Sequence, residues 1–167
     1  MTFKAFLFVA AVCAAALPST GTAQSDTKIL TVSGKIMKTN TPDGKYVFSF
    51  DDLQKLGDMT INSTARYTEV GQFTGPKIRD ILKTVGVGPD ATMVSVVTLD
   101  GYQQNIPLTD FAKWEVIAAH TVNGKRLPVE AKGPLWIMYP IDKYPGELMN
   151  QTTSAKLVWS LSGLVVK

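Results

Sequence analysis

Hydrophobic and polar positions alternate over short distances along this chain, a pattern that predicts several short strands and few helices. Strands are expected where β-branched and aromatic residues cluster or alternate with polar ones, over residues 29–37, 46–50, 59–64, 91–99, 102–106, 116–120, 135–139 and 159–166. The strands do not alternate regularly with helices, so the expected fold class is α+β, with a mixed β-sheet core and short helices.

The clearest predicted helix follows Gly75-Pro76, because apolar residues then recur at helical spacing and Gly86 provides the stop. Two shorter helices are expected nearby. We expect Asp51 or Asp52 to cap the first and Thr109 the second, since their side-chain oxygens can accept hydrogen bonds from first-turn backbone N–H groups.

The stretch from residue 131 to residue 159 is expected to organise the rest of the chain. Lys132-Gly133-Pro134 predicts a reversal, because Gly permits positive φ and Pro interrupts strands. The five apolar residues 135–139 then predict a strand buried on both faces. A polar, irregular loop is expected over residues 141–154, and long polar loops after buried strands often carry binding sites.

The first 23 residues have the pattern of a secretory signal peptide. Lys4 precedes an apolar run, and Gly21-Thr22-Ala23 supplies the small residues of a cleavage site. The run is about twelve residues, shorter than the roughly 20 that span a bilayer, so a retained anchor is the less favoured alternative. Lipidation at Cys13 is disfavoured because Val12 before it is bulky. We expect a periplasmic protein with one domain over residues 24–167.

The composition excludes several kinds of site. Cys13 is the only cysteine and His120 the only histidine, so the expected mature chain has no disulfide, no cysteine-ligated metal and no multi-histidine site. Without Lys4, 16 Lys and Arg residues remain against 14 Asp and Glu, and no basic cluster stands out. A nucleic-acid partner is therefore not expected.

Six short motifs suggest a family through their order and spacing, although each alone is an ordinary turn. They are Phe73 to Leu82 (FTGPKIRDIL), Asp100-Gly101-Tyr102, Ile106-Pro107, Asn123-Gly124 with Leu127, Lys132-Gly133-Pro134, and Tyr139-Pro140 with Trp159. Over nearly all of residues 29–166 the chain resembles the molybdopterin-binding domain of the sulfite-oxidase-fold oxidoreductases. The resemblance implies a sulfite-oxidase-like fold.

One departure from this family bears on function. The resemblance implies that catalytic members bind molybdenum through a cysteine thiolate in the strand before the Phe-x-Gly element, and residues 61–67 of this chain contain no cysteine. A Ser or Thr hydroxyl is a poor substitute because it stays protonated near neutral pH. No bound molybdenum is therefore expected, and no catalytic or metal-binding residue is assigned.

Three possible functions stay open, of which the first two follow from the resemblance. The favoured one is that of a small, exported, cysteine-less subfamily that binds free pterins and reports them to a membrane-bound cyclic-di-GMP enzyme. Its expected partner is the periplasmic domain of that membrane receptor. The alternatives are a molybdopterin-dependent oxidoreductase with an unusual ligand, and an interaction protein with a vestigial pocket that uses the apolar surface around Trp114 or Trp136.

A pterin is a flat heteroaromatic ring with adjacent donors and acceptors, so its site needs a stacking face and a carboxylate or amide. Asp142 is the main candidate, because an acid directly after a buried strand and Pro140 is well placed to accept paired N–H donors. Phe73 could instead belong to the core, Arg66 to the surface, and His120 and Tyr144 could be structural. The full set of ligand-binding candidates is Thr64, Arg66, Tyr67, Phe73, His120, Tyr139, Asp142, Tyr144 and Asn150.

The signal peptide gives a direct prediction. Intact-mass measurement of the periplasmic fraction should find a chain that begins near Gln24, because the small-residue pattern ends at Ala23. Membrane-associated protein that retains Met1 would contradict this expectation.

Overall fold

The structure is a computed structural model that describes residues 28–64 and 70–167. The expected signal peptide lies outside the described residues. Two of the candidate ligand-binding residues, Arg66 and Tyr67, also lie outside them. The fold and the site are therefore built from the remaining residues.

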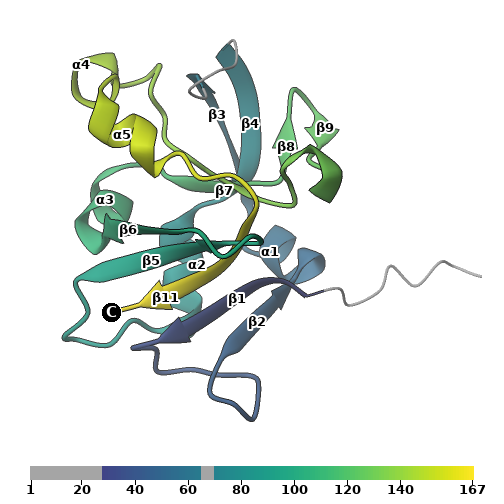
Figure 1. Ribbon diagram of the computed structural model, residues 1–167, viewed down its shortest axis with the longest axis vertical. Helices are drawn as coiled ribbons and strands as arrows, with labels where there is room; N and C mark the ends of the chain where they lie inside the picture. The colour runs from purple at the N-terminus through teal and green to yellow at the C-terminus, as the bar shows by residue number, and fades with distance from the viewer. Residues whose placement is uncertain (1–27, 65–69) are drawn as a thin grey trace, which may run out of the picture.

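A five-stranded sheet forms the lower half of the molecule in Figure 1. Its first and last strands in sequence, β1 and β11, pair in parallel, and all its other pairs are antiparallel. The sheet is therefore mixed, as the α+β prediction requires. Its strands, in spatial order, are β2 (Tyr46–Ser49), β1 (Lys28–Gly34), β11 (Leu161–Val166), β5 (Met93–Thr98) and β6 (Gln103–Pro107).

Two smaller sheets lie above it. The four-stranded sheet has the order β3 (Asp58–Thr64), β4 (Val70–Pro76), β8 (Thr121–Val122) and β9 (Lys125–Arg126), and the two-stranded sheet pairs β10 (Trp136–Met138) with β7 (Ile117–Ala119). The backbones of β4 and β7 approach closely at Gly75, where a Cβ atom would lie 2.0 Å from the carbonyl oxygen of Ala118. Only Gly permits this approach.

The helices are short: α1 (Phe50–Lys55), α2 (Ile78–Val85), α3 (Leu108–Lys113), the 3₁₀ helix η1 (Val129–Ala131), α4 (Pro145–Leu148) and α5 (Gln151–Lys156). The prediction for α2 is confirmed, because all its apolar residues are buried and Gly86 ends it at a φ of 67°. No helix among the described residues has the length and apolar character needed to cross a bilayer.

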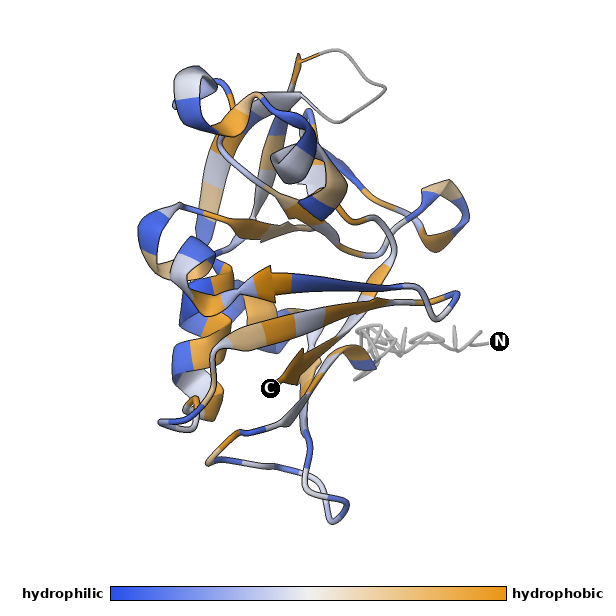
Figure 2. Cartoon of the chain, turned by 60° about the vertical axis from the view of Figure 1, so that its left-hand side comes forward, coloured by the Kyte–Doolittle hydropathy of each residue, from blue (hydrophilic) through white to orange (hydrophobic). Residues whose placement is uncertain are grey.

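Two hydrophobic clusters form the core. The larger contains Leu30 and Leu164 of the five-stranded sheet with Ile81 of α2, and the smaller contains Phe73 of β4 with Trp136 of β10. Figure 2 shows hydrophobic colour concentrated on the central strands and hydrophilic colour on loops and outer helix faces. The strand 135–139 is confirmed as buried, although the paired strand β10 covers only three of its residues.

Two capping predictions are wrong. The cap of α1 is Ser49, whose hydroxyl accepts the N–H of Asp52 at 3.2 Å, while the Asp52 carboxylate accepts the N–H of Ser49 at 3.1 Å. The Ser49 hydroxyl, which also donates to the Asp52 carboxylate at 2.7 Å, and then the Ser49 N–H lower the pKa of Asp52. Thr109 lies inside α3, which begins directly after Pro107. Both helices start earlier than expected because each follows immediately on a strand.

The segment after η1 also differs from expectation. The positive φ of the reversal, 65°, belongs to Lys132 rather than to Gly133. Gly133 is needed for space, since a Cβ atom there would lie 2.3 Å from the carbonyl oxygen of Leu127. The predicted irregular loop contains α4 and the first four residues of α5, and Asn150 starts α5 by accepting the N–H of Thr153 at 2.9 Å.

Candidate functional site

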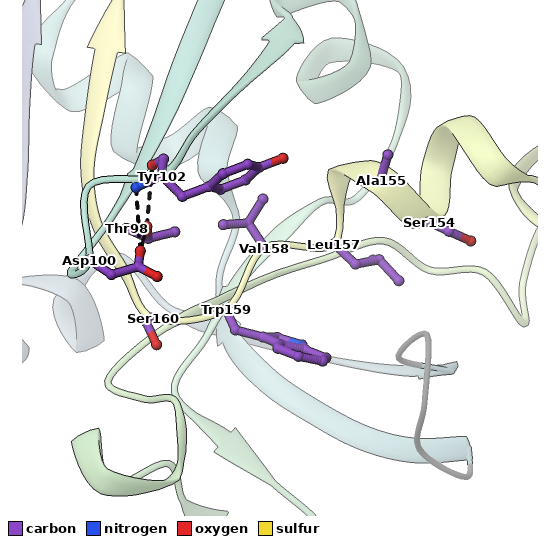
Figure 3. Close-up of a pocket in the computed structure, with 9 residues that line it drawn as sticks. All are labelled: Thr98, Asp100, Tyr102, Ser154, Ala155, Leu157, Val158, Trp159 and Ser160. Carbon is purple, nitrogen blue, oxygen red and sulfur yellow. Dashed lines mark hydrogen bonds between the residues drawn. The ribbon is translucent and has the colours of Figure 1, made fainter.

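A cavity of about 310 Å³ lies between the β5–β6 turn and the segment that joins α5 to β11 (Figure 3). We call it the aromatic pocket. Tyr102 lines it on the side of the turn, and Val158 and Trp159 on the side of the joining segment. Its full lining is Thr98, Asp100, Tyr102, Ser154, Ala155, Leu157, Val158, Trp159 and Ser160.

The charged side chain among these lining residues is that of Asp100. Its Oδ1 accepts the hydroxyl of Thr98 and, at 3.3 Å, the N–H of Tyr102. These two hydrogen bonds, the hydroxyl first, lower the pKa of Asp100, so the group is ionised at neutral pH. Its Oδ2 receives no hydrogen bond from the part of the chain that the structure describes, which leaves this oxygen available to a ligand.

Two aromatic side chains line the same pocket. Tyr102 is 54% exposed, and its hydroxyl donates to Oε1 of Gln104 at 3.1 Å. The indole of Trp159 packs 5.8 Å from that of Trp136, and the Lys132 ammonium lies 3.8 Å from its ring centroid. Contacts with Trp136 and Lys132 thus hold the Trp159 ring in place, while the Tyr102 ring remains accessible to solvent. Together they offer stacking surfaces for a flat ring.

A second cavity of about 430 Å³ adjoins the aromatic pocket, because Ser154 and Leu157 line both. We call it the α5 cavity. Its complete lining is Thr64, Ile141, Met149, Asn150, Gln151, Ser154 and Leu157, none of which carries a charge. The structure therefore brings together two of the predicted site residues, Thr64 and Asn150, beside the aromatic pocket.

The main candidate, Asp142, lies at a third cavity. This cavity, of about 260 Å³, is lined by Met59, Thr60, Ile61, Asn62, Pro140, Asp142 and Lys143. Asp142 is exposed there, and neighbouring Lys143 forms an ion pair with Glu115 at 2.9 Å. No aromatic side chain lines this cavity, so the structure does not place Asp142 beside a stacking surface.

The remaining candidates have structural contacts and line none of these three cavities. Phe73 is buried and packs 5.9 Å from Trp136, and Tyr144 packs 5.0 Å from Trp114. His120 is only 4% exposed, and its Nε2 lies 3.0 Å from Oδ1 of Asp58. The sequence analysis gave a structural role as the alternative to ligand binding for Phe73, Tyr144 and His120, and the observed contacts are of that structural kind.

Tyr139 belongs to a buried polar cluster. Its hydroxyl donates to Oδ2 of Asp110 at 2.8 Å, and the Lys156 ammonium donates to the same oxygen at 2.7 Å. Burial, followed by the charge of Asp110, raises the pKa of Tyr139. Lys156 stands between Ala155 and Leu157, which line the aromatic pocket. The cluster therefore holds α5 in the position that shapes the pocket.

Sequence reasoning did not assign Asp100, Tyr102 or Ser154 to the site. Asp100-Gly101-Tyr102 was recognised only as a turn and a family motif. The sequence feature that could have indicated this site is an aromatic residue, Tyr102, two positions after an acidic residue, Asp100, at the tip of a hairpin. Which segment this tip faces depends on long-range packing, and the turn sequence carries no information about that.

The comparisons with known proteins agree with the fold. Residues 24–143 match the family described as "Oxidoreductase molybdopterin binding domain", so the chain belongs to this family. Among solved structures, the sulfane dehydrogenase SoxCD from Paracoccus pantotrophus is similar, with a TM-score of 0.61 and 15% identity. The match covers 84% of this chain and 38% of the SoxCD chain. A search of curated proteins found no match.

These findings confirm the resemblance and the sulfite-oxidase-like fold. The two parts of the family's cofactor, the pterin ring and the metal, can each be compared with the residues of this chain. A pterin ring fits the donors, acceptors and aromatic faces of the pocket. A molybdenum held by a protein thiolate does not fit, because residues 24–167 contain no cysteine, and no group of three or more His, Cys, Asp or Glu gathers among the described residues.

The buried cluster can be tested through Tyr139→Phe. The variant keeps the ring and removes the hydrogen bond to the Asp110 carboxylate, so the free energy of unfolding should fall by about 1.5 to 3 kcal/mol. Tyr102→Phe is the matched control and should change it by less than about 0.5 kcal/mol, since Tyr102 is exposed. Urea denaturation measures both, and equal stability of the two variants would contradict the role of the cluster.

Proposed function

We propose that this domain binds a pterin reversibly in the aromatic pocket and performs no redox chemistry itself. The observation that carries the proposal is the ionised Asp100 carboxylate, with an available oxygen, in a pocket lined by Tyr102 and Trp159. Membership of a molybdopterin-binding family supports a pterin over other flat heterocycles.

The pocket groups match the two kinds of surface that a pterin offers. The ring amino group and neighbouring N–H present donors, which Oδ2 of Asp100 accepts, and charge-assisted bonds of this kind are stronger than neutral ones. The ring faces stack on Tyr102 and Trp159, and aromatic pairs contribute about 0.5 to 1.5 kcal/mol beyond area burial. The α5 cavity leaves room for a ring substituent next to Ser154.

The proposal extends to the cellular role. The chain would be exported, and its pterin-bound form would be recognised by the periplasmic domain of a membrane-bound cyclic-di-GMP enzyme. The signal-like residues 1–23 and the absence of cysteine after Cys13 support this reading over an oxidoreductase. The name of the SoxCD neighbour describes a dehydrogenase, and at 15% identity that likeness supports the fold alone.

Isothermal titration with 6-methyltetrahydropterin tests the site. The parent should bind, and Asp100→Asn should lower the affinity by about tenfold, because the amide offers one neutral acceptor in place of a charged carboxylate. Asp51→Asn, an exposed acid on α1, is the matched control and should leave the affinity unchanged. Thermal melts of all three proteins check that folding is preserved.

Asp142→Asn separates the structural assignment from the sequence-based one. Loss of affinity in this variant, with none in Asp100→Asn, would move the site to the cavity beside Pro140. No heat of binding and no ligand-induced rise in melting temperature for the parent would reject pterin binding altogether.

Elemental analysis tests the absence of redox chemistry. Protein purified from its native compartment should contain no stoichiometric molybdenum, because the expected mature chain offers no thiolate ligand. About one molybdenum atom per chain would instead support a molybdopterin-dependent oxidoreductase with a different ligand.

A further inference from the structure

Strand β3 is an edge strand with an open side. It pairs with β4 over all seven of its residues, Asp58–Thr64, and no strand among the described residues pairs with its other side. Every second residue of such a strand points its backbone N–H and C=O groups away from its partner. No backbone hydrogen bond of the described residues outside the β3–β4 ladder uses a group from residues 58–64.

The third cavity runs along this open side. Four consecutive β3 residues line it, Met59, Thr60, Ile61 and Asn62. Successive side chains of a strand point to opposite faces, so a cavity bounded by four in a row faces the edge of the strand rather than one of its faces. The cavity therefore presents unpaired backbone donors and acceptors, which another extended backbone can satisfy.

The opposite wall does not protect the edge. Natural proteins often block edge strands with an inward lysine. Here the Lys143 ammonium is directed to Glu115, at 2.9 Å from its Oε1, and lies 5.1 Å from the ring centroid of Tyr144. Asp142 lines the cavity, is exposed, and forms no ion pair with a described residue. Lys143 also lines the cavity but is paired with Glu115, so Asp142 is the charged lining residue that has no ion pair with a described residue.

We propose that this cavity binds an extended segment of a partner protein, which adds to β3 as a further strand and places a basic side chain near Asp142. Backbone pairing provides affinity in this mode of recognition, and side-chain contacts provide selectivity. The site is separate from the aromatic pocket, since the two cavities share no lining residue. The proposal does not depend on pterin binding.

The test uses the full chain expected after export and a capped heptapeptide of alternating threonine and valine with a central lysine. Two further peptides carry N-methyl groups on alternate amides, one on each edge of the extended peptide. Among residues 59–62, the parent peptide should protect the amides that point away from β4 from hydrogen exchange at least tenfold at saturation. One N-methylated peptide should lose this protection, because only one peptide edge faces β3.

Asp142→Asn should lower the affinity for the lysine peptide by about twofold to fivefold, as expected for the loss of an exposed ion pair. The same variant should bind a peptide with threonine in place of lysine as tightly as the parent chain does. The control variant, Asp51→Asn, should bind the lysine peptide and the threonine peptide with the affinities of the parent chain.

Three results would overturn the proposal. They are absence of protection at residues 59–62, equal binding of both N-methylated peptides, and protection of these amides in a dimer of the chain without peptide. The last would make a second copy the occupant. Pterin titration of the same preparations reports on the proposed function independently.

Discussion

One carboxylate oxygen, Oδ2 of Asp110, holds the part of the structure on which the candidate site depends. It accepts both the Tyr139 hydroxyl and the Lys156 ammonium, and thereby joins α3, the end of the buried 135–139 strand and α5. A helix of six residues is not stable in isolation, so α5 needs such tertiary contacts. Removing one member of a mostly buried ion pair leaves an uncompensated charge. The pocket wall therefore depends on a cluster outside the pocket.

The family scaffold supports more than one kind of site on this chain. The segment from Pro140 to Ser160 contributes to the aromatic pocket, the α5 cavity and the cavity beside β3. The two available carboxylates, Asp100 and Asp142, lie at different cavities with different surroundings. One has aromatic neighbours suited to a flat ring, and the other faces the edge of a strand.

The predicted site residues fall into two groups, those positioned by local contacts and those positioned by packing against distant parts of the chain. Asn150 was expected to bind ligand through its amide, and that amide caps α5, a local role that a polar residue before a helix often has. Phe73 was a candidate because it flanks the strand that lacks the family's cysteine, and Tyr139 because it lies beside the polar loop. Both side chains instead point into cores assembled from distant strands. Nothing in the local sequence decides which face of a short buried strand meets a cavity.

The sequence by itself determined the α+β class, the amphipathic helix α2, the hairpin turns and the family, because these rest on periodicity, on turn chemistry and on the order of motifs. It also determined that the chain after Cys13 carries no thiolate. Only the tertiary structure decided that Asp100 and Tyr102 line one cavity with Trp159, which lies 57 residues after Tyr102 in the chain, and that Asp142 lines a cavity with residues of β3. The physical reason is that a pocket forms where separate elements pack against each other, and local patterns do not specify that packing.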